Sequence, residues 1–248
     1  MKFAICIPSI LDVEIVSKTV PAIKENIIEA NPAVFFTLFS NVDNFRQEDC
    51  EGSKEDILEL YSSLESKNCK VDIQYSENRK GYNGATEYLL NKFINSDSEY
   101  CMFYDDDHKI INPMPITSMY KSFSDDKVFH FGNTYSKCSS ENPWINEAIQ
   151  EIDSYVVASN VGSFYTYPGT VLSKSQAVNI FSQASFKNTT DNAEVVIGST
   201  PFYKSLPVYS IFHKHKSFKL LAEGPFRIPL DCHYSLDLRR YARKTCSD

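Results

Sequence analysis

Three consecutive carboxylates and a histidine, Asp105-Asp106-Asp107-His108, follow an apolar run of strand length at 100–104. Apolar and aromatic residues of this kind are typical of a buried central strand. Carboxylates at such close spacing repel one another, and each raises the pKa of its neighbours unless a cation lies among them. Oxygen ligands of this type suit Mg²⁺ or Mn²⁺, which could hold a phosphate-bearing substrate. The alternative interpretation is an acidic, solvated turn.

The composition excludes several classes of function. The chain has 248 residues, enough for one large domain, and a formal net charge of −7. A negative chain is a poor general binder of nucleic acid or membrane surfaces, because both need a cationic face. The seven cysteines lack the spacing of a metal site, which indicates free thiols in a reducing compartment. With neither a signal peptide nor a transmembrane span in the sequence, we expect a soluble, cytoplasmic protein.

Strands and helices alternate along the first half of the chain. Apolar runs predict strands at 2–7, 33–39, 70–75 and 100–104, and helical periodicity predicts helices at 13–30, 53–64 and 84–94. The strands are continuously apolar, which indicates a parallel sheet covered by helices on both faces. Ligands bind such sheets beyond the carboxyl ends of the strands, so we expect the loops that follow these strands to form one cleft. The second half is less regular: strands are expected at 128–131, 163–172 and 208–212, and helices at 173–182 and from 194 onward.

Three segments of the first half form an ordered set of motifs. The first strand ends at Pro8-Ser9, residues 75–85 read Tyr-Ser-Glu-Asn-Arg-Lys-Gly-Tyr-Asn-Gly-Ala, and residues 103–107 end in the three acids. Together they resemble the motifs of GT-A-type glycosyltransferases, and most of all the family 2-like branch. The resemblance implies an α/β, Rossmann-like fold with a mostly parallel central sheet flanked by helices, in a single domain over 1–248. It also implies a nucleotide-sugar-binding half at about 1–112 and an acceptor-side half at about 113–248.

This resemblance implies a metal-dependent transferase that moves a sugar from a nucleotide-sugar donor, with a UDP-sugar favoured, to an acceptor hydroxyl. Mn²⁺ or Mg²⁺ would neutralise the charge that builds on the departing nucleoside diphosphate. Asp105 and Asp107 would bind the ion, and His213 or His215, at the end of a late strand, would complete its shell. The residues expected to contact the donor are Pro8, Ser9, Asn41, Asp43, Asn78, Arg79, Gly81, Asn83, Asp105 and Asp106, although Asp106 could instead point away, because neighbouring strand residues face opposite sides.

The second half is expected to supply the acceptor side. Residues 188–196 resemble the family's Glu-Asp-x-x-Leu segment, which implies that Asp191 is the general base of a single displacement with inversion. Glu194 is the reserve candidate for the base, and a helix N-cap at Asp191 is the alternative interpretation. Three residues are expected near the acceptor or the donor sugar: Trp144, Tyr167 and Gly169. The acceptor class, the donor sugar, the choice of ion and the oligomeric state stay open.

Two departures from the family pattern leave other functions as alternatives. The second strand is followed by Ser40-Asn41 rather than by acids, and Thr190 stands where the family has Glu. A non-catalytic module that binds sugars or nucleotides is therefore one alternative. A nucleotidyltransferase that makes sugar nucleotides is the other, but its Gly-rich, basic loop after the first strand is absent from residues 8–12.

Overall fold

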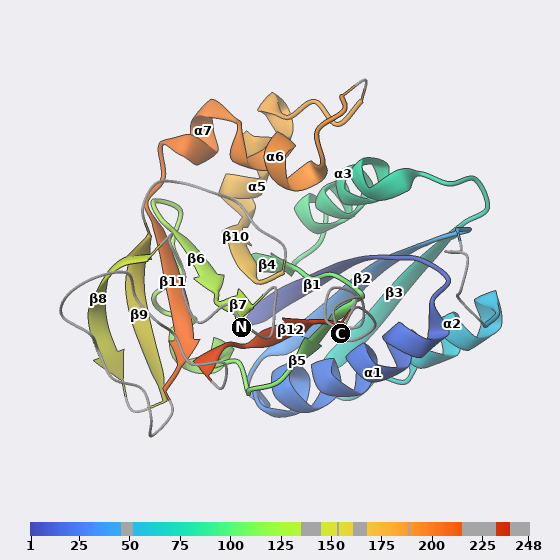
Figure 1. Cartoon of the computed structure of the whole chain (residues 1–248), viewed down its shortest axis with the longest axis horizontal. Coiled ribbons are helices and arrows are strands. Elements are labelled where there is room, and N and C mark those ends of the chain that lie inside the picture. Colours follow the sequence, from blue (N-terminus) through green and yellow to red (C-terminus); the bar gives the residue numbers. More distant parts are fainter. Residues whose placement is uncertain are drawn as a thin grey trace, which may run out of the picture.

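The structure is a computed structural model that describes residues 1–45, 52–134, 145–152, 154–160, 168–187, 189–214 and 232–238. The strands of its central sheet are β1 (Lys2–Ser9), β2 (Phe35–Asp43), β3 (Cys69–Ser76), β4 (Tyr100–Phe103), β6 (Val128–Phe131), β8 (Ile145–Ile152), β9 (Tyr155–Asn160), β10 (Thr170–Ser173) and β11 (Val208–His213). They are ordered β3-β2-β1-β4-β10-β6-β11-β9-β8 (Figure 1). A second, small sheet is ordered β5-β12-β7 and consists of β5 (His108–Ile110), β12 (Ser235–Asp237) and β7 (Asn133–Thr134).

Strands from both halves of the chain build the central sheet. Strands β3, β2, β1 and β4 are mutually parallel, as the continuous apolar runs predict. Strand β10 lies antiparallel between β4 and β6, β11 is parallel to β6, and β9 lies antiparallel between β11 and β8. Seven of these nine strands therefore point in the same direction, with β10 and β9 reversed.

Helices cover both faces of the sheet. They are α1 (Val13–Ile23), the π-helical η1 (Lys24–Glu29), α2 (Lys54–Ser62), α3 (Gly81–Ile94), α4 (Ile116–Met119), α5 (Lys174–Gln183), α6 (Ala193–Gly198) and α7 (Pro201–Lys204). Figure 1 shows α1 and α2 on one side of the sheet and α3, α5, α6 and α7 on the other, and each layer buries its own apolar cluster. None of the helices in the described ranges is long and apolar enough to cross a membrane.

Local chemistry explains most of the element boundaries. Ser53 caps α2 in a reciprocal pair with Asp56, and Ser173 caps α5 in the same way with Gln176. The helix expected over 13–30 changes to a π-helix at Lys24, three residues after Pro21, whose ring nitrogen cannot donate a helical hydrogen bond.

The second strand, expected at 33–39, extends farther along the chain than the sequence predicts. Strand β2 instead continues to Asp43, because it pairs with β1 on one side and β3 on the other up to that point. Its polar end residues are buried, and the side chains of Asn41 and Asp43 find hydrogen-bond partners inside the protein. The end of β2 is therefore part of the sheet edge that faces the candidate site.

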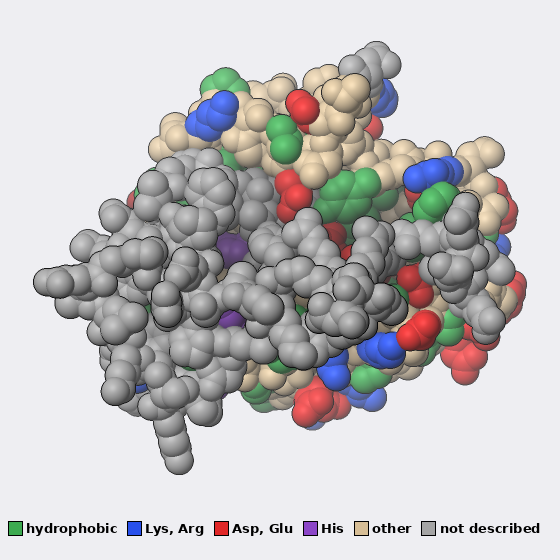
Figure 2. All heavy atoms as spheres, in the orientation of Figure 1, with side chains coloured by type: hydrophobic (Ala, Val, Ile, Leu, Met, Phe, Trp, Pro, Cys, Tyr) green, Lys and Arg blue, Asp and Glu red, His purple; other side chains and the backbone are tan. Residues whose placement is uncertain are grey.

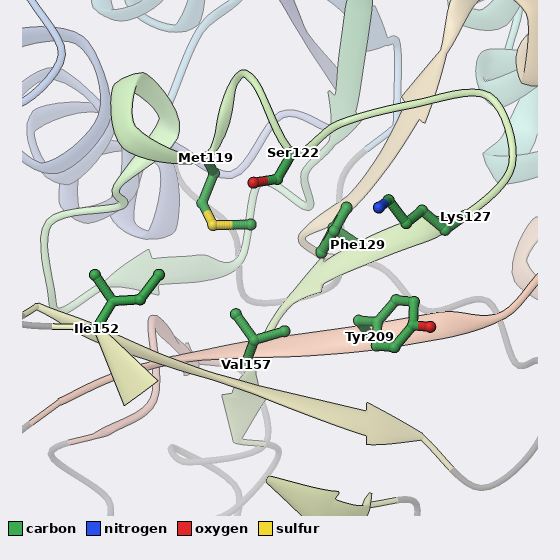
Figure 3. A pocket seen from close by; sticks show the side chains of 7 residues that line it. All are labelled: Met119, Ser122, Lys127, Phe129, Ile152, Val157 and Tyr209. Carbon is green, nitrogen blue, oxygen red and sulfur yellow. The ribbon is translucent and has the colours of Figure 1, made fainter. Parts of the chain in front are cut away.

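A pocket of about 220 Å³ lies beside the second half of the sheet (Figure 3). Met119 of α4, Phe129 of β6 and Val157 of β9 line it, with Lys127 and Tyr209 on one side. The acidic residues that follow β4 are not among its lining residues. This pocket is therefore separate from the cluster described next.

Candidate functional site

Asp105, Asp107 and His108 form a compact group at the carboxyl end of β4. One ligand atom from each lies within 4.8 Å of the others. Nδ1 of His108 lies 2.9 Å from Oδ1 of Asp107 and 3.7 Å from Oδ2 of Asp105. The hydroxyl of Tyr82, at the start of α3, donates a hydrogen bond of 3.1 Å to Oδ1 of Asp105. Two carboxylates and an imidazole are a donor set that fits Mn²⁺, and the carboxylates suit Mg²⁺ as well.

Burial and like charge make this cluster electrostatically unfavourable without a cation. Burial, together with the charges of Asp107 and Glu194, raises the pKa of Asp105 to about 8 against the opposing effect of His108. Burial opposes the charge on His108, but the hydrogen bond to Asp107 and the charges of nearby carboxylates, including Asp237, outweigh it and raise the pKa of His108. A divalent cation among these groups would relieve the repulsion.

These two shifts predict that the metal-free protein loses stability as the pH rises. The pKa of Asp105 is higher in the folded state than its ordinary value of 3.8, so the folded state holds a proton that the unfolded state releases. The stability that this proton provides is present below the ordinary value and is lost as the pH rises toward about 8. The raised pKa of His108 acts in the same direction above 6.5.

Urea unfolding in EDTA at about pH 5 and about pH 8 measures this effect. Asp105→Asn removes the titrating group, so the variant should lose less stability between the two pH values than the wild type. An equal loss in both proteins would contradict the shift assigned to Asp105.

Two members of this environment were not among the predicted site residues. His108 directly follows the three acids, and this adjacency is a signal that could have identified it. Asp237 lies 129 positions farther along the chain, and only the pairing of β12 with β5 places it opposite His108. Its carboxylate is buried and contributes to the raised pKa of His108.

Asp106 points away from this cluster and lies in the turn that follows β4. Its Oδ2 accepts hydrogen bonds of 3.0 Å from the hydroxyl of Ser9 and from the backbone N–H of Ile10. The hydroxyl of Tyr61 on α2 donates to Oγ of Ser9 at 3.1 Å. Asp106 therefore ties the end of β4 to the end of β1, and it fixes the backbone that carries Asp105 and Asp107.

A second buried network joins the ends of β2 and β3 to the start of α3. Nδ2 of Asn41 donates to Oδ1 of Asp43 at 3.0 Å, and the hydroxyl of Ser76 donates to Oδ1 of Asn41 at 3.0 Å. The other carboxylate oxygen of Asp43 accepts from the backbone N–H of Gly81 at 2.8 Å. Pro8 lies beside Asn41 in the register of β1 and β2. These predicted donor contacts thus lie together at one edge of the sheet.

The loop between β3 and α3 carries exposed groups. Asn78 and Arg79 are exposed, and the guanidinium of Arg79 lies 3.8 Å from the centre of the Phe45 ring. Asn83 lies on the first turn of α3, and its Nδ2 donates a hydrogen bond of 2.8 Å to the backbone oxygen of Asp191. The structure therefore places the loop expected to bind the nucleotide-sugar next to the segment that carries Asp191, the predicted general base.

Asp191 is exposed and lies just before α6. The N-cap of this helix is Asn192, which accepts a hydrogen bond of 3.0 Å from the backbone N–H of Val195. The alternative of an N-cap at Asp191 was therefore wrong. Glu194 lies in the first turn of α6, close enough for its charge to affect Asp105. Figure 2 shows acidic and apolar side chains on the face of the molecule below α3 and α6.

The other predicted residues lie elsewhere. His213 ends β11 and is not in the Asp105–Asp107–His108 group; its ring packs edge-on against Tyr234, with centroids 6.3 Å apart. Three predicted residues lie outside the described ranges: Trp144, Tyr167 and His215.

Gly169 lies inside the sheet framework, between the ends of β4 and β6. Its N–H donates to the carbonyl of Phe103 at 3.0 Å, and its carbonyl accepts from Phe131 at 2.9 Å. Its φ is +106°, and a Cβ would lie 2.6 Å from the carbonyl oxygen of Phe131. The structure therefore requires a glycine here for the backbone conformation, whatever contact with a sugar it makes.

Gly169→Ala is expected to lower the free energy of unfolding by about 3 kcal/mol, through backbone strain and a clash with main-chain atoms. Gly81→Ala is the matched control: its φ is also positive, at +68°, but a Cβ would meet nothing within 4 Å. That variant should lose about 1 kcal/mol. Urea unfolding measures both, and equal losses would show that the clash at Gly169 has no effect.

No model of a protein family matches the chain, and no curated protein matches its sequence. Among solved structures, the chain is similar to S. aureus TarS 1–349, with a TM-score of 0.57, and to the same protein in complex with UDP, with a TM-score of 0.55. TarS is a GT-A-like glycosyltransferase. The chain has the GT-A fold.

This result confirms the fold predicted from the motifs of the first half. In both comparisons 14% of residues are identical, and the match covers 85% of this chain and 60% of the TarS chain. Identity at this level shows the common fold, and the chain spans less than two thirds of TarS 1–349. The activity must therefore be argued from the site itself.

Proposed function

We propose that the protein is a metal-dependent glycosyltransferase that moves a sugar from a nucleotide-sugar donor to an acceptor hydroxyl. The observation that carries this proposal is the Asp105–Asp107–His108 group at the carboxyl end of β4. On a sheet of this kind, ligands bind at that edge. The GT-A fold supports the same class of reaction, because structural neighbours with this fold are glycosyltransferases.

Asp105, Asp107 and His108 would hold Mn²⁺ or Mg²⁺, and the ion would neutralise negative charge on the leaving diphosphate. Tyr82 would orient Asp105 through its hydroxyl hydrogen bond, and Asp106 would hold the backbone of the two ligands in place. His108 is the histidine that the geometry supports as a ligand. A contribution from His213 or His215 stays a prediction.

The donor would lie across the edge formed by the ends of β1, β2 and β3 and the start of α3. A uridine nucleotide is favoured, since the structural neighbour TarS has been solved in complex with UDP. Asn78 and Arg79 have exposed donors at this edge, and the ring of Phe45 beneath Arg79 adds a flat apolar surface. These groups are suited to binding the nucleobase and the ribose of the donor.

Asp191 would accept the proton of the acceptor hydroxyl, which gives single displacement with inversion at the anomeric carbon. The hydrogen bond from Asn83 to the backbone of Asp191 supports this assignment, because it fixes the segment beside the donor loop. Glu194 is the competing candidate, since its charge reaches the metal-binding group.

A thermal-shift series tests the donor site. UDP, GDP, CMP and dTDP are each added with Mn²⁺, with Mg²⁺ and with EDTA. A ligand that binds only the folded protein raises the melting temperature by linkage. We expect UDP to raise it with a divalent ion present and to have no effect in EDTA. The absence of a metal-dependent shift with all four nucleotides would contradict the proposed donor site.

A further inference from the structure

A groove of about 570 Å³ lies between α3 and α5. Along α3 it is lined by Lys80, Asn83, Glu87, Tyr88 and Asn91, whose spacing of three and four residues places them on one face of the helix. Eleven residues of α-helix span about 16 Å. The groove is therefore elongated, which suits a chain-like ligand better than a single compact molecule.

The lining combines aromatic rings with hydrogen-bonding groups. The aromatic residues that line it are Tyr88 on α3, Phe181 on α5 and Phe186 in the segment after α5. Sugar rings stack their apolar C–H faces on such aromatic rings. Asn83 and Asn91 present amides, which can donate and accept hydrogen bonds with sugar hydroxyls at the same time.

The charges of the groove nearly balance. Nζ of Lys187 lies 4.0 Å from Oε1 of Glu87, so this pair spans the groove from α3 to the segment after α5. Nζ of Lys80 lies 4.5 Å from the centre of the Tyr88 ring. Recognition of a nucleic-acid backbone would need a row of cations, and a lipid tail would need a continuously apolar wall. A polyhydroxylated chain fits this mixture best.

The groove begins at the proposed reaction centre. Lys80 immediately precedes Gly81, whose N–H is bound by Asp43. Asn83 lines the groove and also donates its hydrogen bond to the backbone of Asp191. A chain in the groove would thus have one end beside the proposed base and would extend from there along α3.

We propose that the acceptor is a sugar chain, and that the α3–α5 groove binds it. The proposal rests on the proposed function, since it places the acceptor of that reaction. The groove would hold the sugar units behind the accepting end. Tyr88 stacks on one of these units, and Asn91 hydrogen-bonds to a unit farther from Asp191.

A glycan array probed with the full chain in the presence of UDP and Mn²⁺ tests this proposal. The wild type is expected to bind a set of oligosaccharides, and Tyr88→Ala and Asn91→Ala to bind the same set about tenfold more weakly. Asn91 is exposed, so its variant tests the groove even if Tyr88→Ala fails to fold. Asn179→Ala, on α5 and outside the groove lining, is the matched control and should bind like the wild type.

Binding of no oligosaccharide by the wild type, or binding that neither groove variant weakens, would overturn the proposal. The UDP thermal shift on the same preparation separates this failure from failure of the proposed function. A thermal shift with UDP but no glycan binding would support the donor site and contradict the proposal that the groove binds a sugar chain. Glycan binding that depends on Tyr88, without a thermal shift with UDP, would support the groove as a carbohydrate-binding site and contradict the proposed transferase activity.

Discussion

Asp107→Asn is expected to lower the rate of sugar transfer by about 10³-fold, because an ion held by Asp107 would supply several kcal/mol of transition-state stabilisation. The amide keeps an oxygen that can accept the hydrogen bond from His108, so the fold should survive. The same change should also weaken binding of Mn²⁺. Release of the nucleoside diphosphate from UDP-sugars, followed over a range of Mn²⁺ concentrations, measures both effects.

Asp125→Asn is the matched control for this substitution. Asp125 is an exposed carboxylate in the loop before β6, and it is not in the metal-binding group. Its variant should transfer sugar at the wild-type rate. A fully active Asp107→Asn enzyme would show that the cluster does not hold the catalytic ion.

Asp191→Asn is expected to reduce kcat by about 10³-fold, within the range that a positioned general base contributes. The affinity for Mn²⁺ and for UDP should stay at the wild-type level, because Asp191 is not in the Asp105–Asp107–His108 group. This combination separates loss of the base from loss of the donor site. Initial rates over a range of acceptor concentrations, together with the UDP thermal shift, measure the two effects independently.

Glu194→Gln distinguishes the two candidate bases. If Asp191 is the base, Glu194→Gln should keep most of its activity and should lower the pKa of Asp105, because a neighbouring negative charge is removed. If kcat falls in Glu194→Gln and not in Asp191→Asn, the assignment must be reversed. The proposed inversion, which the anomeric configuration of the product would test, does not depend on this outcome.

The parts of the protein that the sequence alone determined are those whose cause lies within a few residues. The apolar run that ends in Asp105-Asp106-Asp107 predicts a buried strand followed by a cluster of carboxylates, and β4 and its carboxylates have this arrangement. The capping position of Ser53 is equally local, since it involves a partner three residues away.

Pairing between segments far apart in the chain decided which site residues lie close together. The apolar run of the second strand ends at 39, but pairing with β1 on one side and β3 on the other extends β2 to Asp43. Asp237 reaches His108 only because β12 pairs with β5, and Asp191 meets Asn83 only because α6 lies beside α3. No short pattern encodes which distant segments will share a sheet edge, because that choice depends on burying two apolar clusters at once. The sequence therefore determined the types of the site residues, and the tertiary structure decided which of them meet.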